Sequence, residues 1–97
     1  MPWLKRLKGC PMKIKVVTAV WCHACLLMKK RIKELTKKNP ELIFEMIDLD
    51  FDEDKLIGLE VGKILPVYFV YHDDVLIKRF VGEKSIDELE REIHHAD

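Results

Sequence analysis

The feature that most constrains the fold is a short β-branched run that passes directly into an amphipathic helical pattern. Residues Ile14 to Ala19 read Ile-Lys-Val-Val-Thr-Ala, which has the length and composition of a strand. From about Cys22 to Lys38 the apolar residues recur with the period of a helix. They fall on one face, at Cys25, Met28, Ile32 and Leu35. Asn39-Pro40 ends this helix, and a following strand would complete a right-handed β-α-β unit with parallel strands.

A second strand and a short second helix follow. The run from Leu42 to Leu49 predicts the strand. Asp52 is placed to cap a short helix over Glu53–Val61, and Gly62 is placed to close it. The acidic run over residues 48–52 is similar to the first half of a calcium loop, but its sixth position is not the glycine that such a loop needs. We interpret it as an acidic strand end that leads into the helix cap.

The last third of the chain predicts an antiparallel hairpin and a final helix. The runs Val67–Tyr71 and Val75–Val81 are rich in β-branched and aromatic residues, and only a short turn separates them. Ser85 and Glu88 have the spacing of a capping box, which begins a helix that runs to about His94. The elements therefore follow the order β-α-β-α-β-β-α, which is an α/β fold.

Size and composition fit one globular domain over residues 1–97, with residues 1–13 as an N-terminal arm. The chain has 97 residues, of which 48% are hydrophobic and 35% charged, so it is too short for two independent cores. No apolar run approaches the ~18 residues of a membrane span. The N-terminus carries positive charge without the apolar segment of a secretory signal. We therefore expect a cytoplasmic monomer that does not associate with membranes.

The charges are balanced in total and divided along the chain. The 17 Lys and Arg equal the 17 Asp and Glu, which argues against a general nucleic-acid binder. Residues 1–38 hold eleven basic residues and one acidic residue, which gives 11 − 1 = +10, and residues 39–97 hold six and sixteen, which gives 6 − 16 = −10. Either the two parts neutralise each other on the folded surface, or the basic part forms a positive face that steers an acidic partner.

Two of the three cysteines, Cys22 and Cys25, form a C-x-x-C pair, and Cys10 is interpreted as an incidental thiol. The pair could be half of a zinc site, but the remaining Cys and the four His have no zinc-finger spacing. We therefore expect no bound metal. The pair instead stands in Trp21-Cys22-His23-Ala24-Cys25, where a strand passes into a helix.

This position gives the pair its chemistry. A helix N-terminus concentrates positive potential and free backbone N–H groups, which stabilise a thiolate. We therefore expect Cys22, at the start of the helix, to have a lowered pKa and to attack a substrate disulfide. Cys25 lies one turn deeper and is expected to resolve the mixed disulfide, which leaves a Cys22–Cys25 disulfide.

With these residues the chain resembles the thioredoxin family over roughly residues 13–95. The similarity consists of a strand, Trp-Cys-x-x-Cys, a helix, a strand ending in acidic residues, a short helix, Pro66 before a hairpin, Gly82, and a last helix. The resemblance implies a minimal thioredoxin-like domain with a four-stranded mixed sheet in the order second, first, third, fourth strand. It places the first and third helices on one face and the short helix on the other.

The resemblance also implies an activity and a substrate site. The chain would be a thiol–disulfide oxidoreductase whose redox group is its own Cys22–Cys25 pair, with no other cofactor. Leu65-Pro66 would be a cis peptide beside the dithiol, and the backbone of Leu65 would pair with the substrate. The expected partners are proteins with disulfides and a reductase or small thiol that supplies electrons.

The chain also departs from the family pattern. His23-Ala24 replaces the usual Gly-Pro between the cysteines, and the family's buried Asp and its Lys partner fall on Val16 and near Met46. We expect Trp21, His23 and Ala24 to tune the dithiol, with His23 acting electrostatically. Two alternatives remain at this stage: a glutaredoxin-like reductase that uses glutathione, and a non-catalytic module whose C-x-x-C binds a metal or a partner.

Overall fold

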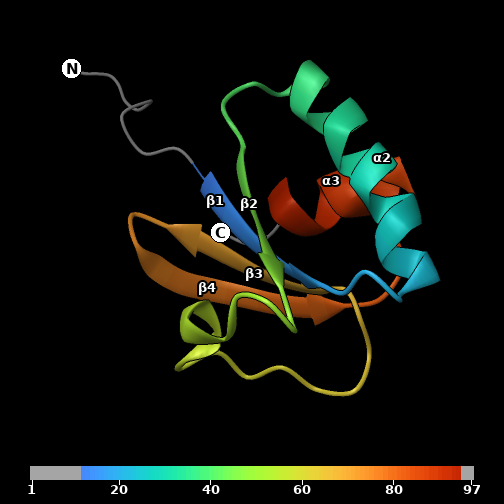
Figure 1. The fold of residues 1–97 in the computed structure, drawn as a ribbon. Helices are drawn as coiled ribbons and strands as arrows, with labels where there is room; N and C mark the ends of the chain where they lie inside the picture. The colour runs from blue at the N-terminus through green and yellow to red at the C-terminus, as the bar shows by residue number, and fades with distance from the viewer. Residues whose placement is uncertain (1–11, 95–97) are drawn as a thin grey trace.

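The computed structural model describes residues 12–94 of the chain. Its elements are β1 (Met12–Thr18), α2 (His23–Lys38), β2 (Ile43–Asp48), the short 3₁₀ helix η1 (Glu53–Leu56), β3 (Val67–His72), β4 (Val75–Val81) and α3 (Ile86–His94) (Figure 1). Most of the predicted N-terminal arm, with Cys10, lies outside the described residues. Met12 and Lys13, which were expected to belong to the arm, are instead strand residues, because they pair with His72 and Tyr71 of β3.

The sheet has the predicted order, β2-β1-β3-β4. β1 pairs with β2 in parallel, with Ile14 opposite Phe44. β3 is antiparallel to both β1 and β4, with Val16 opposite Tyr68 on one side and Tyr68 opposite Phe80 on the other. The mixed four-stranded sheet of a minimal thioredoxin fold is therefore confirmed.

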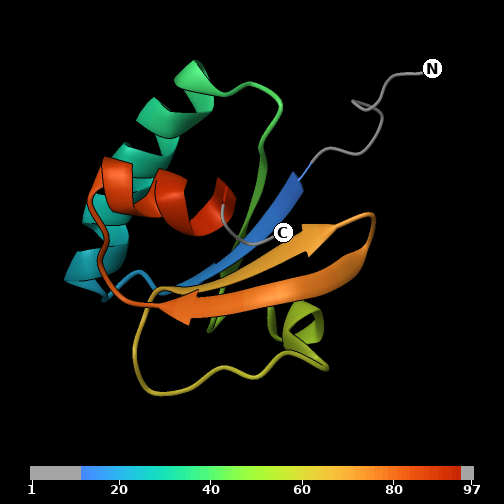
Figure 2. The same cartoon turned by 180° about the vertical axis from the view of Figure 1, so that it is seen from behind.

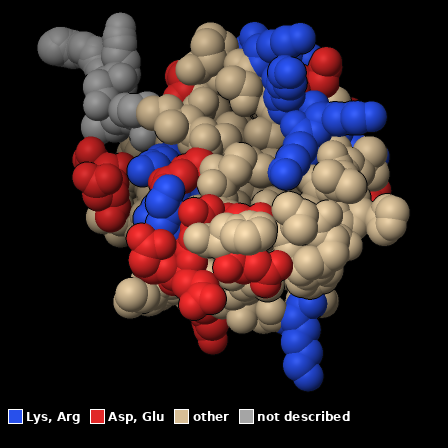
Figure 3. Space-filling model, in the orientation of Figure 1, with Lys and Arg blue, Asp and Glu red and all other residues tan. Residues whose placement is uncertain are grey.

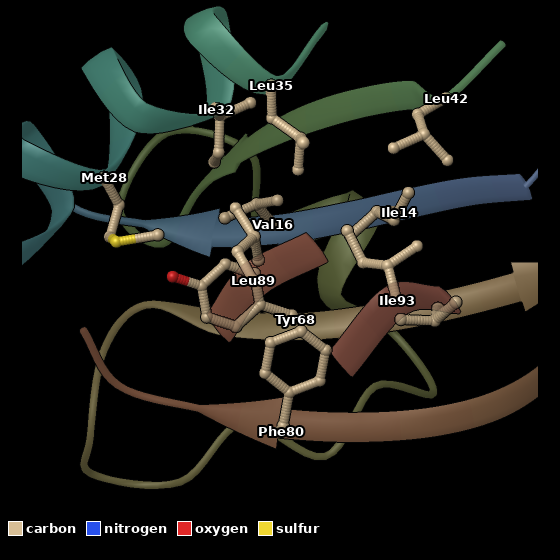
Figure 4. Packing of buried hydrophobic residues seen from close by; sticks show 11 residues of the cluster. Ile14, Val16, Met28, Ile32, Leu35, Leu42, Tyr68, Phe80, Leu89 and Ile93 are labelled. Atoms are coloured by element: carbon tan, nitrogen blue, oxygen red, sulfur yellow. The ribbon is translucent and has the colours of Figure 1, made fainter. Parts of the chain in front are cut away.

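Two helices cover one face of the sheet and η1 lies on the other, as predicted (Figures 1 and 2). The larger core lies between the sheet and the helices α2 and α3 (Figure 4). Its buried members are Ile14, Val16, Met28, Ile32, Leu35, Leu42, Tyr68, Val70, Phe80, Leu89 and Ile93. The four apolar residues that predicted one buried face of the first helix are all buried. A smaller core of Val17, Ile47, Val67 and Phe69 lies on the η1 side.

The predicted short helix over Glu53–Val61 is wrong in length and in its cap. Only Glu53–Leu56 is helical, and its geometry is 3₁₀. The side chain of Asp52 makes no cap bond, because its carboxylate accepts the backbone N–H of Asp48 at 2.9 Å. Gly58, with a φ of +85°, rather than Gly62, adopts the left-handed conformation that follows the helix. The acidic side chain thus closes the turn after β2 instead of starting a helix.

The hairpin and the last helix follow the sequence prediction closely. Asp73 and Asp74 form the turn between β3 and β4, and both have positive φ. The Glu88 N–H donates to the Ser85 hydroxyl at 3.1 Å, and the Ser85 N–H donates to the Glu88 carboxylate at 2.9 Å. This is a reciprocal capping box, and its hydrogen bonds hold the pKa of Glu88 below its ordinary value.

Candidate active site

Cys22 lies at the N-cap of α2, at the end of a turn that leads out of β1. Its N–H donates to the carbonyl of Ala19 at 3.1 Å, and its backbone is extended, with a φ of −96° and a ψ of 113°. The side chain therefore takes the place that a Ser or Asp cap usually occupies. The Cys22 sulfur accepts the backbone N–H of Cys25 at 3.2 Å, so the first turn of the helix hydrogen-bonds directly to this sulfur.

Cys25 has a different environment from Cys22. Cys22 is partly exposed, whereas Cys25 is fully buried, and both are free thiols in the structure. Burial raises the pKa of the Cys25 thiol from 9.0 to about 12, with a further rise from its hydrogen bond with Cys22. A hydrogen bond with the backbone of Ala19 and the charge of Lys29 act in the opposite direction and are smaller. The two sulfurs are therefore adjacent, with one open to a partner and the other protected as a neutral thiol.

Trp21 precedes the dithiol and lies mostly on the surface, with 62% of the residue exposed. Its indole N–H donates to the Asp50 carboxylate at 3.0 Å, which ties the turn before Cys22 to the turn after β2. The sequence analysis considered Asp50 only as part of a rejected calcium loop and missed this contact. The signal that could have found it is the indole N–H, which needs an acceptor, together with the parallel pairing that brings the ends of β1 and β2 together.

The two residues between the cysteines begin the helix. His23 is its first residue and is exposed, and Ala24 is half-buried. The first turn of α2 contains no acidic residue. Val16, at the position of the family's buried carboxylate, is fully buried and lies opposite Met46 in the sheet. An apolar pair thus occupies the two places where the family carries an acid and a base.

The segment before β3 reaches the same end of the sheet as the dithiol. Val67 lies opposite Val17, so the preceding Leu65 and Pro66 lie toward the end of β1 that leads to Cys22. Figures 1 and 2 both show this segment beside the N-terminal end of α2. The Leu65–Pro66 peptide bond is cis, Pro66 is buried and Leu65 is half-buried. The Pro66 carbonyl accepts the N–H of Gly82 at 2.9 Å, which joins it to the end of β4.

The loop after β4 is held against α2 by contacts that the sequence analysis missed. Arg31 donates to the carbonyl of Lys84 at 2.7 Å and pairs with the Glu83 carboxylate at 3.3 Å. The sulfur of Met28 accepts the N–H of Lys84 at 3.3 Å. The buried Tyr68 hydroxyl donates to the carbonyl of Gly82 at 3.1 Å, and burial raises its pKa. These contacts fix the loop and, through the hydrogen bond of Gly82, the position of Pro66 before β3.

Within residues 12–94, no three His, Cys, Asp or Glu side chains gather in a way that could hold a metal ion. In the same range no helix is long and apolar enough to cross a membrane.

Known thioredoxins resemble the chain in sequence and in structure, although no family model matches it. It is 33% identical over 76 residues to an H-type thioredoxin of Picea mariana, a match that covers 78% of this chain and 59% of that protein. It is 30% identical over 93 residues to the H-type thioredoxin 1 of Nicotiana tabacum, which covers 92% of this chain and 72% of that protein. The chain thus spans less than two thirds of the first relative and more than two thirds of the second.

A comparison with solved structures shows that the chain has the fold of a thioredoxin. The structure of Fasciola hepatica thioredoxin superimposes with a TM-score of 0.80 over 90% of this chain and 82% of that chain, at 23% identity. The sequence match with the Nicotiana tabacum protein, the shared fold and the Cys22–Cys25 pair at the start of α2 lead to one assignment. The chain belongs to the thioredoxin family.

Proposed function

We propose that the protein is a thiol–disulfide oxidoreductase that works through Cys22 and Cys25. The observation that carries this proposal is the asymmetry of the pair. Cys22 is partly exposed at a helix N-cap, and its sulfur accepts a hydrogen bond from the N–H of Cys25, whose own thiol is buried. An exposed thiol at a helix N-terminus is the arrangement that favours a nucleophilic thiolate.

The reaction has two steps of thiol–disulfide exchange. The Cys22 thiolate attacks one sulfur of the substrate disulfide, the substrate S–S bond breaks, and its other sulfur leaves as a thiolate. Cys25 then loses its proton, for which the departing substrate thiolate is an acceptor, and attacks the Cys22 sulfur. The mixed disulfide breaks and a Cys22–Cys25 disulfide forms. The substrate has gained two electrons, and the dithiol has lost them.

The difference in burial between the two cysteines supports these two roles. A substrate protein can approach Cys22 but not the fully buried Cys25. The high pKa of Cys25 keeps its thiol protonated while Cys22 reacts. The second step can therefore begin only after the first step has released a substrate thiolate that accepts the proton of Cys25. Trp21, Leu65 and the first helix residues, His23 and Ala24, border the exposed sulfur in this proposal, and the backbone of Leu65 pairs with the substrate beside Pro66.

The reaction needs an electron donor and no group beyond the dithiol. A reductase or a small thiol would return two electrons to the Cys22–Cys25 disulfide, and disulfide-bearing proteins would be the substrates. A cytoplasmic, monomeric protein stays the prediction from sequence. The two alternatives, a glutathione-dependent reductase and a metal- or partner-binding module, predict different results in the experiment that follows.

The test is to trap the intermediate. The reduced Cys25→Ser variant, incubated with a protein disulfide such as insulin, should accumulate a covalent adduct through Cys22, seen by mass spectrometry and released by dithiothreitol. The parent protein should turn insulin over with dithiothreitol as donor, and Cys22→Ser should do neither. A Cys25→Ser variant that keeps full multiple turnover only with glutathione would favour the glutaredoxin-like alternative. A parent that reduces no disulfide would favour the binding module.

A further inference from the structure

A row of lysines runs along one exposed face of α2 and starts beside the dithiol. We call this face the lysine ridge, and its residues are Leu26, Lys29, Lys30, Lys33 and Lys37. Apart from the neighbours Lys29 and Lys30, successive residues are three or four positions apart, which places the group on one side of the helix, and all five are exposed. The N–H of Leu26 donates to the carbonyl of Cys22 at 3.2 Å, so the ridge begins one helical turn from the nucleophile. From Lys29 to Lys37 it extends about 12 Å along the helix.

The ridge lysines carry four positive charges, and one acidic residue, Glu34, stands among them on α2. Among residues 12–94, Lys13, Lys55, Lys78 and Lys84 form ion pairs with glutamates, and none of the four ridge lysines does. Arg31, on another side of α2, pairs with Glu83. Lysines three or four residues apart repel each other and weaken a helix slightly. This part of the surface therefore keeps a concentrated positive charge, at a small cost in stability to the helix that carries the dithiol.

The acidic side chains lie elsewhere on the same surface. Figure 3 shows basic side chains gathered over α2 and acidic ones over the segment that joins β2 to η1. The stretch from the end of β2 to the start of η1 contains Asp48, Asp50, Asp52, Glu53 and Asp54, and Asp50 accepts the indole N–H of Trp21, the residue before Cys22. The lysines of the ridge and the acidic residues of this stretch thus lie on separate parts of the surface, while other charges of opposite sign, such as Arg31 and Glu83, pair with each other.

We propose that the lysine ridge is the docking surface for an acidic segment of the disulfide-bearing protein whose disulfide Cys22 attacks. This inference rests on the proposed function, since it concerns the substrates of the same dithiol. The occupant has to reach Cys22 and the ridge together, which favours a polypeptide with acidic residues close to its disulfide. The exposed Leu26 and Trp21 contact the residues next to the substrate sulfurs, and the lysines pair with the acidic residues beyond them. The acidic segment on the Trp21 side repels the same substrate in the reverse orientation.

The experiment compares two disulfide peptides that differ only in charge. One carries Asp and Glu next to its disulfide, and the other has Ser and Gln at those positions. The measured quantity is the ratio of kcat/KM for the acidic peptide to kcat/KM for the neutral peptide. The parent should prefer the acidic peptide, and the ratio should fall as salt rises from about 0.02 M to 0.2 M, because screening weakens exposed charge pairs.

The variant that tests the ridge is Lys33→Gln/Lys37→Gln. It avoids Lys29, whose charge acts on the Cys25 thiol. The ratio should fall by about 3- to 10-fold, the range expected when two exposed ion pairs are lost. The control, Lys13→Gln/Lys15→Gln, removes the same charge from β1, a strand that reaches the dithiol only at its other end, and should leave the ratio within about 2-fold of the parent, since distant exposed charges are screened.

The other outcomes of the experiment distinguish a failure of the ridge proposal from a failure of the proposed function. If the parent reduces both peptides equally, or if both double variants lower the ratio alike, the ridge is not a docking surface while the proposed function stands. If the parent reduces neither peptide, the proposed function is wrong and the ridge proposal falls with it. If a short single-stranded DNA binds the Cys22→Ser protein more tightly than the acidic peptide does, and Lys33→Gln/Lys37→Gln removes that binding, the ridge serves a nucleic acid and the proposal is overturned.

Discussion

The backbone N–H of Cys25 donates a hydrogen bond to the sulfur of Cys22 at 3.2 Å. The backbone of Cys25 therefore contacts the sulfur of Cys22, while the side chain of Cys25 is buried. The two thiols, one helical turn apart, thus differ in exposure and in their hydrogen bonds. The inequality has consequences that can be measured without any substrate.

The first is the order of alkylation. In the reduced protein at pH 8, iodoacetamide should modify Cys22 first, because Cys22 is partly exposed and Cys25 is buried with a pKa of about 12. Peptide mapping by mass spectrometry after short exposure would give the ratio of the two products. In Cys22→Ser, Cys25 should stay largely unmodified in the native protein and react fully in urea. Rapid native modification of Cys25 would contradict the assignment of roles.

The second consequence is a dependence of stability on pH. Between pH 9 and about 12 the unfolded state loses a proton from Cys25 that the folded state retains, since the folded pKa is raised from 9.0 to about 12. The free energy of unfolding of the reduced protein should therefore be unaffected by this group below pH 9 and fall as the pH rises above it. Urea unfolding at pH 7.5 and pH 10.5 measures the fall. Cys25→Ala should show a smaller fall, and parallel curves for the two proteins would show that burial of this thiol has no such effect.

The sequence predicted the fold because local and long-range signals agree. Three local signals each predict one element independently of the rest of the chain. They are the β-branched run of the first strand, the buried helix face of Cys25, Met28, Ile32 and Leu35, and the Ser85–Glu88 capping box. The short helix could not be predicted in the same way. Asp52 is as suitable for a turn as for a helix cap, and its bond to the N–H of Asp48 depends on where β2 ends.

The site, like the fold, was predicted from the sequence only where local patterns specify it. The cysteines and their order along the helix follow from the sequence, since an N-cap position and a three-residue spacing fix them. The anchors of the site, Asp50 to Trp21 and Arg31 to Lys84, join residues 29 and 53 positions apart. Such contacts depend on sheet register and loop path, which no local pattern encodes. The charge asymmetry was visible in the sequence, but only the fold shows which charges pair, such as Lys13 with Glu45, and which, such as the ridge lysines, form no ion pair within residues 12–94.

The contact between Trp21 and Asp50 predicts a role for an acidic residue outside the dithiol. Asp50→Ala should release the indole, change the tryptophan fluorescence and lower the free energy of unfolding by about 0.5–1 kcal/mol, as for one exposed hydrogen bond. It should also slow the reduction of protein disulfides, because Trp21 borders Cys22. Asp50→Asn keeps an oxygen acceptor and should recover most of the loss. Asp54→Ala removes an acid of the same exposed segment and serves as the charge control. Equal effects of Asp50→Asn and Asp50→Ala would mean that charge, not the hydrogen bond, matters.

His23 is expected to tune the dithiol. It is exposed at the first position of α2, next to the nucleophile. A protonated imidazole there would stabilise the Cys22 thiolate and hence the reduced dithiol, which makes the protein more oxidising. His23→Ala should therefore lower the reduction potential by up to about 30 mV, which corresponds to about 1.4 kcal/mol for two electrons. Equilibration with glutathione buffers measures the potential. Equal potentials for parent and variant would mean that His23 does not tune the dithiol.

The hairpin turn offers a test of the fold that is independent of the chemistry. Asp73 and Asp74 have φ values of 58° and 66°, in the left-handed region where a side chain is costly and Asn-Gly is the preferred pair. Asp73→Asn/Asp74→Gly should therefore raise the free energy of unfolding by about 0.5–1 kcal/mol, measured by urea denaturation. Asp73→Asn/Asp74→Ala removes the same two charges but keeps a Cβ at the positive φ of position 74, and it should not show this gain. If it proved as stable as Asp73→Asn/Asp74→Gly, relief of charge repulsion and not backbone conformation would govern this turn.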